Sequence, residues 1–183
     1  PHLIFSNRDR HELYCAGHLI EAAVAYYNAT GKRKFLDMMC KYADYIEKRF
    51  KIDRDTDFVT PGHEEIELAL VRLYEATGER RYLELSEFFI NSRGQQDEMH
   101  TDWMKNSYGQ SHLPVREQTT AEGHAVRAVY LYCGMADVAY LTGDTELKKA
   151  CETLFHNITD KRSKQFFIYI NVSGFNVCNK INI

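Results

Sequence analysis

A repeated pattern constrains this 183-residue chain more than any other feature. Three segments start with a Gly-His pair, continue as Ala-, Leu- and Tyr-rich amphipathic runs, and stop at a Thr-Gly pair. Self-similarity of this kind is typical of a repeated supersecondary unit. Glycine commonly ends a helix in the left-handed conformation, so each Thr-Gly pair predicts a helix stop followed by a turn and a second helix. With the turn and the first residues of the second helix included, the repeats cover residues 17–36, 62–83 and 123–147.

Hydrophobic periodicity predicts six helices arranged as three hairpins. Each hairpin has one inner and one outer helix, so the sequence predicts an all-α fold that forms part of an α/α toroid. The stretch 92–118 is expected to be the longest irregular segment, and a loop of that length in a compact domain is usually functional. The predicted helices are Arg10–Ala29, Lys34–Phe50, Glu64–Ala76, Arg81–Asn91, Ala121–Leu141 and Thr145–His156.

The last 23 residues differ from the rest of the chain. Fourteen of them are Asn, Ile, Lys or Phe, which A/T-only codons can encode, and Phe166–Val172 has the composition of a strand. Two interpretations remain open: a genuine short terminal strand, or translation out of frame through A/T-rich DNA. We therefore expect a partial toroid domain over residues 1–160 and a divergent tail over residues 161–183.

Composition excludes several classes of protein. The net charge is −3 and there is no basic stripe, so a nucleic-acid binder is not expected. No apolar run reaches the length of a membrane span, and the first residues lack the pattern of a signal peptide. The chain does not start with Met, so we expect it to begin inside a larger protein.

The five cysteines form no CxxC pair, so a disulfide framework is not expected. We expect reduced, mostly helix-embedded thiols that act as small buried hydrophobes. With no signal in the visible chain, this favours a cytoplasmic location. The cysteines are Cys15, Cys40, Cys133, Cys151 and Cys178.

The histidines of the three Gly-His pairs are the first candidates for a functional site. His18, His63 and His124 are predicted at equivalent ends of three hairpins, where they would converge on one rim and line a polar pocket. Helix N-termini offer free N–H groups and a positive dipole end. A neutral imidazole has one donor and one acceptor, which suits sugar hydroxyls. The alternative is that each histidine only hydrogen bonds to the scaffold.

Carboxylates are the second candidates, because paired carboxylates are the usual catalysts of glycoside hydrolysis. Glu64, Glu65 and Glu67 lie at the start of a predicted helix, and Glu12 and Glu21 flank His18. The simpler interpretation is that acids in a first helical turn complement the helix dipole. Tyrosines at helical spacing are expected in the core more often than as stacking platforms.

Three long runs of the sequence resemble glycoside hydrolase family 127, which contains β-L-arabinofuranosidases. The resemblance extends over Asn7–Asp160. It implies an (α/α)6 barrel catalytic domain and retaining hydrolysis of terminal β-L-arabinofuranosyl groups. The expected partner is a small sugar or an arabinofuranoside oligosaccharide. The resemblance also implies that the pocket histidines match His18, His63 and His124, with His112 and Gln118 as weaker sugar-binding candidates. The runs are His11–Tyr27, Pro61–Leu83 and Gln110–Asp144.

The resemblance further implies a zinc-bound cysteine nucleophile and a glutamate acid/base, with the zinc held by a glutamate and cysteines. All of these groups follow the segment that Asn157–Thr159 matches, where this chain diverges from the family. No residue here matches them, and Cys178 fits no ligand spacing. We therefore expect this chain to be inactive by itself and to bind no zinc.

Two alternatives to a β-L-arabinofuranosidase remain open. One is a non-catalytic α/α helical module, either a decayed gene product or a sugar-binding scaffold. The other is a different (α/α)6 sugar enzyme, such as an epimerase or an unsaturated glucuronyl hydrolase. Because three hairpins cannot close a six-hairpin ring, we also expect apolar flanks that favour self-association.

Overall fold

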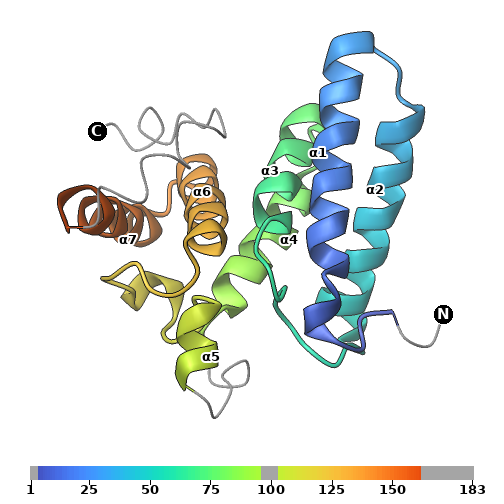
Figure 1. Ribbon diagram of the computed structural model, residues 1–183. Coiled ribbons are helices and arrows are strands. Elements are labelled where there is room, and N and C mark those ends of the chain that lie inside the picture. The colour runs from blue at the N-terminus through green and yellow to red at the C-terminus, as the bar shows by residue number, and fades with distance from the viewer. Residues whose placement is uncertain (1–3, 96–102, 162–183) are drawn as a thin grey trace. The chain divides into compact units, whose positions relative to one another are not determined.

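The computed structural model describes residues 4–95 and 103–161, and every regular element in these ranges is a helix (Figure 1). The prediction of an all-α fold is therefore confirmed. The chain divides into two compact units, Pro1–Phe89 and Ile90–Ile183, with the division inside one helix. Nearly all of the predicted tail, including the expected strand Phe166–Val172, lies outside the described residues. Within the described part, no helix is long and apolar enough to cross a membrane.

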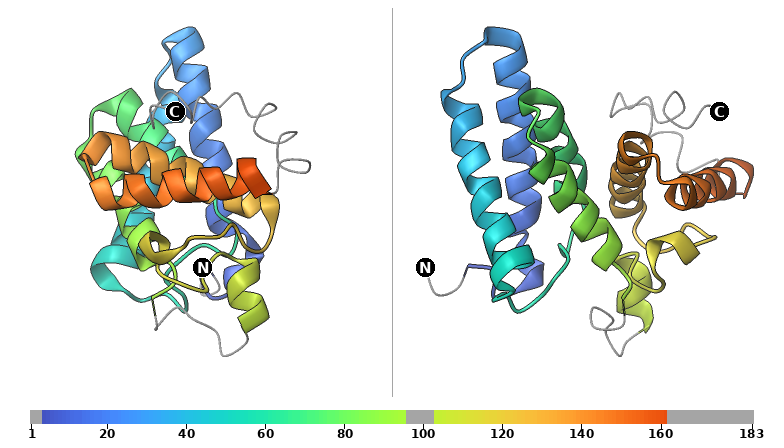
Figure 2. Two further views of the ribbon diagram at one scale, coloured as in Figure 1. Left: turned by 90° about the vertical axis from the view of Figure 1, so that its left-hand side faces the viewer. Right: turned by 180° about the vertical axis from the view of Figure 1, so that it is seen from behind.

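The first unit contains two helical hairpins. Helices α1 and α2 run side by side in opposite directions, and α3 packs along α1 (Figures 1 and 2). Helix α2 continues into a π-helical turn, Lys48–Asp53, which takes up the start of the predicted polar loop. The predicted boundaries hold to within four residues. The helices are α1 Glu12–Thr30, α2 Lys34–Glu47, α3 Ile66–Thr77 and α4 Arg80–Ser92, preceded by a 3-10 turn, Arg8–Arg10.

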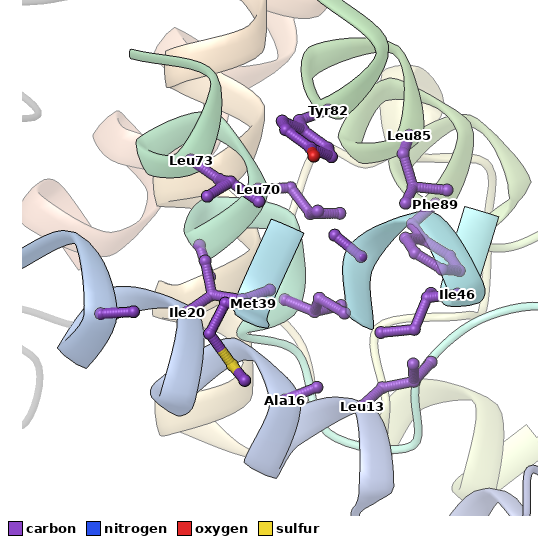
Figure 3. Close-up of a cluster of buried hydrophobic side chains, with 14 of the residues drawn as sticks. Leu13, Ala16, Ile20, Met39, Ile46, Leu70, Leu73, Tyr82, Leu85 and Phe89 are labelled. Atoms are coloured by element: carbon purple, nitrogen blue, oxygen red, sulfur yellow. The ribbon is translucent and has the colours of Figure 1, made fainter. Parts of the chain in front are cut away.

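All four helices contribute to one hydrophobic core, in which Figure 3 shows their side chains pointing toward one another. On α1, the buried positions Leu13, Ala16 and Ile20 recur at spacings of three and four, as an amphipathic helix requires. Each fully buried Leu or Ile contributes roughly 1.5–3 kcal/mol. The Ser86 hydroxyl donates a 2.7 Å hydrogen bond to the backbone oxygen of Glu67 and so fixes α4 against α3.

The second unit is built around the hairpin of α6, Ala125–Thr142, and α7, Thr145–His156, which lie side by side in Figures 1 and 2. Asp144 caps α7 by accepting a hydrogen bond from the Leu147 N–H at 2.8 Å. The prediction that residues 92–118 are irregular is wrong in part, because the described portion contains α5, Trp103–Tyr108, and a 3-10 turn, Val115–Glu117.

The three predicted helix stops are confirmed. Gly31, Gly78 and Gly143 have φ values of +69°, +76° and +72°, and each N–H donates to the carbonyl four residues earlier. The preceding threonine makes the same contact in all three hairpins, because its hydroxyl donates at 2.7 Å to the carbonyl four residues before it. The repeat in the sequence is therefore a repeat of one local hydrogen-bonded cap.

Candidate functional site

The first unit brings two of the predicted histidines together around a tyrosine. The ring centroid of Tyr14 lies 4.5 Å from that of His18 and 4.4 Å from that of His63. The His11 ring adds to this group at 6.0 Å from Tyr14. Tyr14 was not among the predicted site residues, although its position four residues before His18 places it on the same face of a helix. The group combines three imidazoles with one tyrosine ring.

The prediction that the three histidines occupy equivalent helix ends is wrong. His18 lies inside α1, because the helix extends upstream to Glu12, where Leu13 and Ala16 are held in the core. His63 precedes α3 by three residues, and only His124 is the N-cap of its helix. The argument from the helix dipole therefore does not apply to His18.

Gly17 leaves room for a buried carboxyl group. A Cβ atom at this position would lie 1.4 Å from Oε2 of Glu65 and 3.0 Å from the backbone of Ile66. The glycine beside His18 thus permits close packing of α1 against the start of α3, with the carboxyl of Glu65 between them. A substitution here would have to displace that carboxyl.

The Glu65 side chain is fully buried beside His18. Its Oε1 lies 3.4 Å from His18 Nδ1, and Oε2 of Glu21 lies 3.9 Å from the same nitrogen. Burial raises the pKa of Glu65 to about 10, and the neighbouring Glu21 and Glu67 add to this shift. Glu65 is therefore a neutral acid at pH 7, because its charge would be desolvated and next to other carboxylates.

The acids at the start of α3 are buried, a feature that the simpler sequence interpretation did not specify. Glu64, Glu65 and Glu67 all have no exposed surface. Oε2 of Glu67 accepts a 3.1 Å hydrogen bond from the Glu65 N–H, which closes the start of the helix. Charged side chains are seldom fully buried in proteins, and here the packing of α3 against α1 overrides that preference.

The tautomer of His63 is fixed by its own backbone. Its Nδ1 lies 2.8 Å from the carbonyl oxygen of Glu64. A carbonyl can only accept, so the proton of the neutral ring is on Nδ1, and Nε2 is the acceptor nitrogen.

His124 in the second unit also has an aromatic neighbour. The Tyr108 ring lies 5.4 Å from the His124 ring, and the guanidinium of Arg127 lies 4.8 Å from the Tyr108 centroid. The His124 N–H donates to the Tyr108 carbonyl at 3.1 Å. Gly123 is required here, because it has φ +74° and its Cβ would lie 2.1 Å from the carbonyl oxygen of Ser107.

The weaker candidates, His112 and Gln118, lie in the buried part of the same loop. Gln118 uses its amide to donate to the carbonyls of Gln110 and Leu113, both at 2.8 Å. Burial lowers the pKa of His112, so it is a neutral imidazole near pH 7. Their assignment to a sugar site stays a prediction. So does the convergence of all three Gly-His histidines, since His124 belongs to the other unit.

The described residues do not form a zinc site of the kind that the family resemblance implies. Three potential ligands, from His18, Glu21 and Glu65, lie within 4.8 Å of one another, but no thiol belongs to this group. Burial raises the pKa of Cys151 to about 12, so this thiol is protonated near pH 7. Of the other described cysteines, Cys133 is buried, Cys40 is half-buried and Cys15 is exposed.

Comparison with known proteins identifies the family. Residues 4–166 match the model of the β-L-arabinofuranosidase, GH127 catalytic domain. This chain belongs to glycoside hydrolase family 127. The resemblance seen in the sequence is thereby confirmed, and the fold agrees with solved GH127 structures.

Three relatives illustrate the relationship. The chain is 41% identical over 167 residues to a non-reducing end β-L-arabinofuranosidase from Bifidobacterium longum subsp. longum, covering 83% of this chain and 25% of that protein. A GH127 β-L-arabinofuranosidase from Geobacillus stearothermophilus T6 has 55% identity and a TM-score of 0.76, over 83% of this chain and 26% of that one. A GH127 β-arabinofuranosidase has 49% identity and a TM-score of 0.73, over 81% and 22%. The chain thus spans about a quarter of the length of these relatives.

Proposed function

We propose that this GH127 chain supplies part of the sugar-binding wall of a retaining glycoside hydrolase that releases terminal β-L-arabinofuranose. The observation that supports this most directly is the group of Tyr14, His18 and His63. Sugars have hydroxyl groups that pair with imidazole nitrogens and apolar C–H faces that pack on aromatic rings. The activities of the similar proteins indicate which sugar the wall would face.

The test is the release of arabinose from a synthetic β-L-arabinofuranoside by the intact protein. We expect His18→Ala and His63→Ala each to raise KM about tenfold, the effect of losing one hydrogen bond to the sugar. His156→Ala is the matched control, because this histidine lies exposed on α7, with Asp160 3.6 Å from its Nδ1, and is not one of the candidate sugar-binding residues. No release from any pentofuranoside would refute the proposal. Epimerisation of a free sugar without cleavage would instead favour the alternative (α/α)6 enzymes.

We also propose that the 183-residue chain has no turnover by itself. The resemblance places the nucleophile, the acid/base and the zinc ligands in sequence that this chain does not match. The potential ligands around His18 do not replace them, because they include no cysteine. Turnover by the purified chain would contradict this proposal. Arabinose binding without turnover is the expected result, and the absence of both would favour the non-catalytic helical module.

Exposed apolar side chains support the proposal that the chain self-associates. Leu19 and Tyr26 on α1 are 45% and 42% exposed, and Tyr140 on α6 is 65% exposed. Hydrophobic surface of this kind favours association between copies. Sedimentation velocity is expected to show concentration-dependent association that Tyr140→Lys weakens. A wild-type chain that stays monomeric at high concentration would contradict the proposal.

A further inference from the structure

The buried carboxyl of Glu65 has a geometric relation to His18 that the sugar-binding proposal does not explain. It lies in the space left by Gly17, with Oε1 facing His18 Nδ1 at 3.4 Å. The side chain of His18 remains 42% exposed, so the ring is held from the inside and accessible from the outside. A carboxyl on Nδ1 is the usual means by which proteins fix the orientation and tautomer of a histidine.

Glu65 needs a proton to be stable in this place. Neither of its oxygens accepts a hydrogen bond from an N–H or O–H group in the described part of the chain. Besides His18, the titratable groups that face it are Glu21 and Cys15 on α1 and Glu67 on α3, and none of these three can become a cation. A proton on one Glu65 oxygen removes the charge repulsion with Glu21 and leaves the other oxygen, Oε1, to accept from His18 Nδ1–H.

We infer that Glu65 is a positioning residue, which holds His18 with its proton on Nδ1 so that Nε2 is the acceptor offered to the substrate. This inference rests on the proposed function, because it concerns the same sugar-binding wall. His63 has the same tautomer through the Glu64 carbonyl. Two imidazoles on either side of Tyr14 then both accept, which selects a ligand with two hydroxyl donors. The 3.4 Å separation is longer than a strong hydrogen bond, and contacts of this kind tighten when substrate binds.

The direct test is the tautomer of His18, read from the side-chain nitrogen and carbon chemical shifts of the chain by NMR. In the wild type we expect the Nδ1-protonated form. Glu65→Met keeps a side chain of similar length but removes the acceptor, so His18 is expected to change to mostly the Nε2-protonated form. Glu65→Gln keeps an acceptor oxygen and is expected to preserve the wild-type tautomer. Glu12→Gln is the control, because Glu12 is on the same helix but accepts from the Phe5 N–H.

Gly17→Ala provides an independent route to the same result. It alters no charge, but its methyl group would displace the Glu65 carboxyl. If this variant and Glu65→Met both retain Nδ1-protonated His18, the inference is wrong. It is also overturned if Zn²⁺ alone binds the wild-type chain stoichiometrically and Glu65→Gln abolishes that binding, since the group would then be a metal site.

Kinetics of the intact protein separate this inference from the proposed function. We expect Glu65→Met to raise KM for the arabinofuranoside about tenfold with little change in kcat. Glu65→Gln is expected to keep the KM of the wild type. An Nδ1-protonated His18 with no effect of His18→Ala on KM would support the positioning contact and refute the sugar-binding role. If kcat falls and KM rises in both Glu65 variants, Glu65 has a structural role and the inference is overturned.

Discussion

The two units hold their Gly-His histidines by different means. In the first unit, His18 is supported by packed side chains: two helices meet closely and enclose the Glu65 carboxyl. In the second unit, His124 is supported by the loop, where the Gln110 amide donates to the carbonyls of Glu122 and His124 at 2.8 and 3.3 Å. The histidine of the Gly-His pair is therefore held in two different ways. In the first unit it is held by buried side chains, and in the second unit by the backbone geometry of a loop.

The glycines show this difference most clearly. Gly17 is helical, and its role is to leave space for a side chain. Gly123 has a left-handed backbone and also contacts the carbonyl of Ser107. A side chain can adjust its position, whereas a carbonyl in a hydrogen-bonded loop cannot do so without unfolding the loop. We conclude that the second unit tolerates less change at its Gly-His pair than the first.

Among the tests of this comparison, Gly123→Ala is expected to have the largest effect on the free energy of unfolding. The left-handed conformation alone costs about 1–2 kcal/mol for a residue with a Cβ, and the clash with Ser107 adds about 1–3 kcal/mol. Gly143→Ala is the matched control, because Gly143 has nearly the same φ, +72°, but nothing within 4 Å of its Cβ. Denaturant unfolding should show a clearly larger decrease in the free energy of unfolding for Gly123→Ala than for Gly143→Ala. Equal losses would show that the contact with Ser107 is unimportant.

Replacing Gln118 with Leu is expected to have the next largest effect. It removes two hydrogen bonds and leaves the carbonyls of Gln110 and Leu113 unpaired, at a cost of about 2 kcal/mol. Gln95→Leu is the control, because its amide makes one exposed contact, to the Asn91 carbonyl. If Gln118→Leu instead weakened arabinose binding without lowering the free energy of unfolding, the loop-support interpretation would fail and the sugar-binding assignment would gain support.

The smallest expected effect, counted per pH unit, concerns the pH dependence of the free energy of unfolding of the first unit. The pKa of Glu65 is about 10 in the folded state, compared with the ordinary glutamate value of 4.5 that applies to the unfolded chain. At pH 7 the folded state therefore binds one more proton than the unfolded state. The stability associated with this proton is fully present below pH 4.5 and is lost as pH rises through 10. Between these values the free energy of unfolding should fall by about 1.4 kcal/mol per pH unit.

Glu65→Gln removes that proton and should flatten the pH dependence. Urea unfolding at pH 6, 7 and 8 measures the slope, with Glu12→Gln as a control that retains it. A slope in Glu65→Gln as steep as in the wild type would mean that Glu65 does not carry the proton. Because Glu65 lies in the first unit, the change in slope is expected in the unfolding of that unit.

The sequence predicted the hairpins well because their signals are local. Thr-Gly stops, hydrophobic periodicity and turn residues each depend on a few neighbouring positions, and the observed caps match them. The site was predicted less completely. Nothing local distinguishes Glu65, which is fully buried between two helices, from an acid in a solvated first turn. Tyr14 could have been found from its spacing to His18, whereas the packing of His63 onto it depends on long-range contacts.

The three Thr-Gly caps have a practical consequence. Each is closed by its own backbone and hydroxyl contacts, and a Cβ on Gly31, Gly78 or Gly143 would meet no atom within 4 Å. In the first hairpin, Gly31 ends the helix that carries His18 near its other end. These turns are therefore suitable attachment points for fluorophores or short inserted tags, through which the chain could be immobilised or followed while Tyr14 and the histidines beside it keep their surroundings.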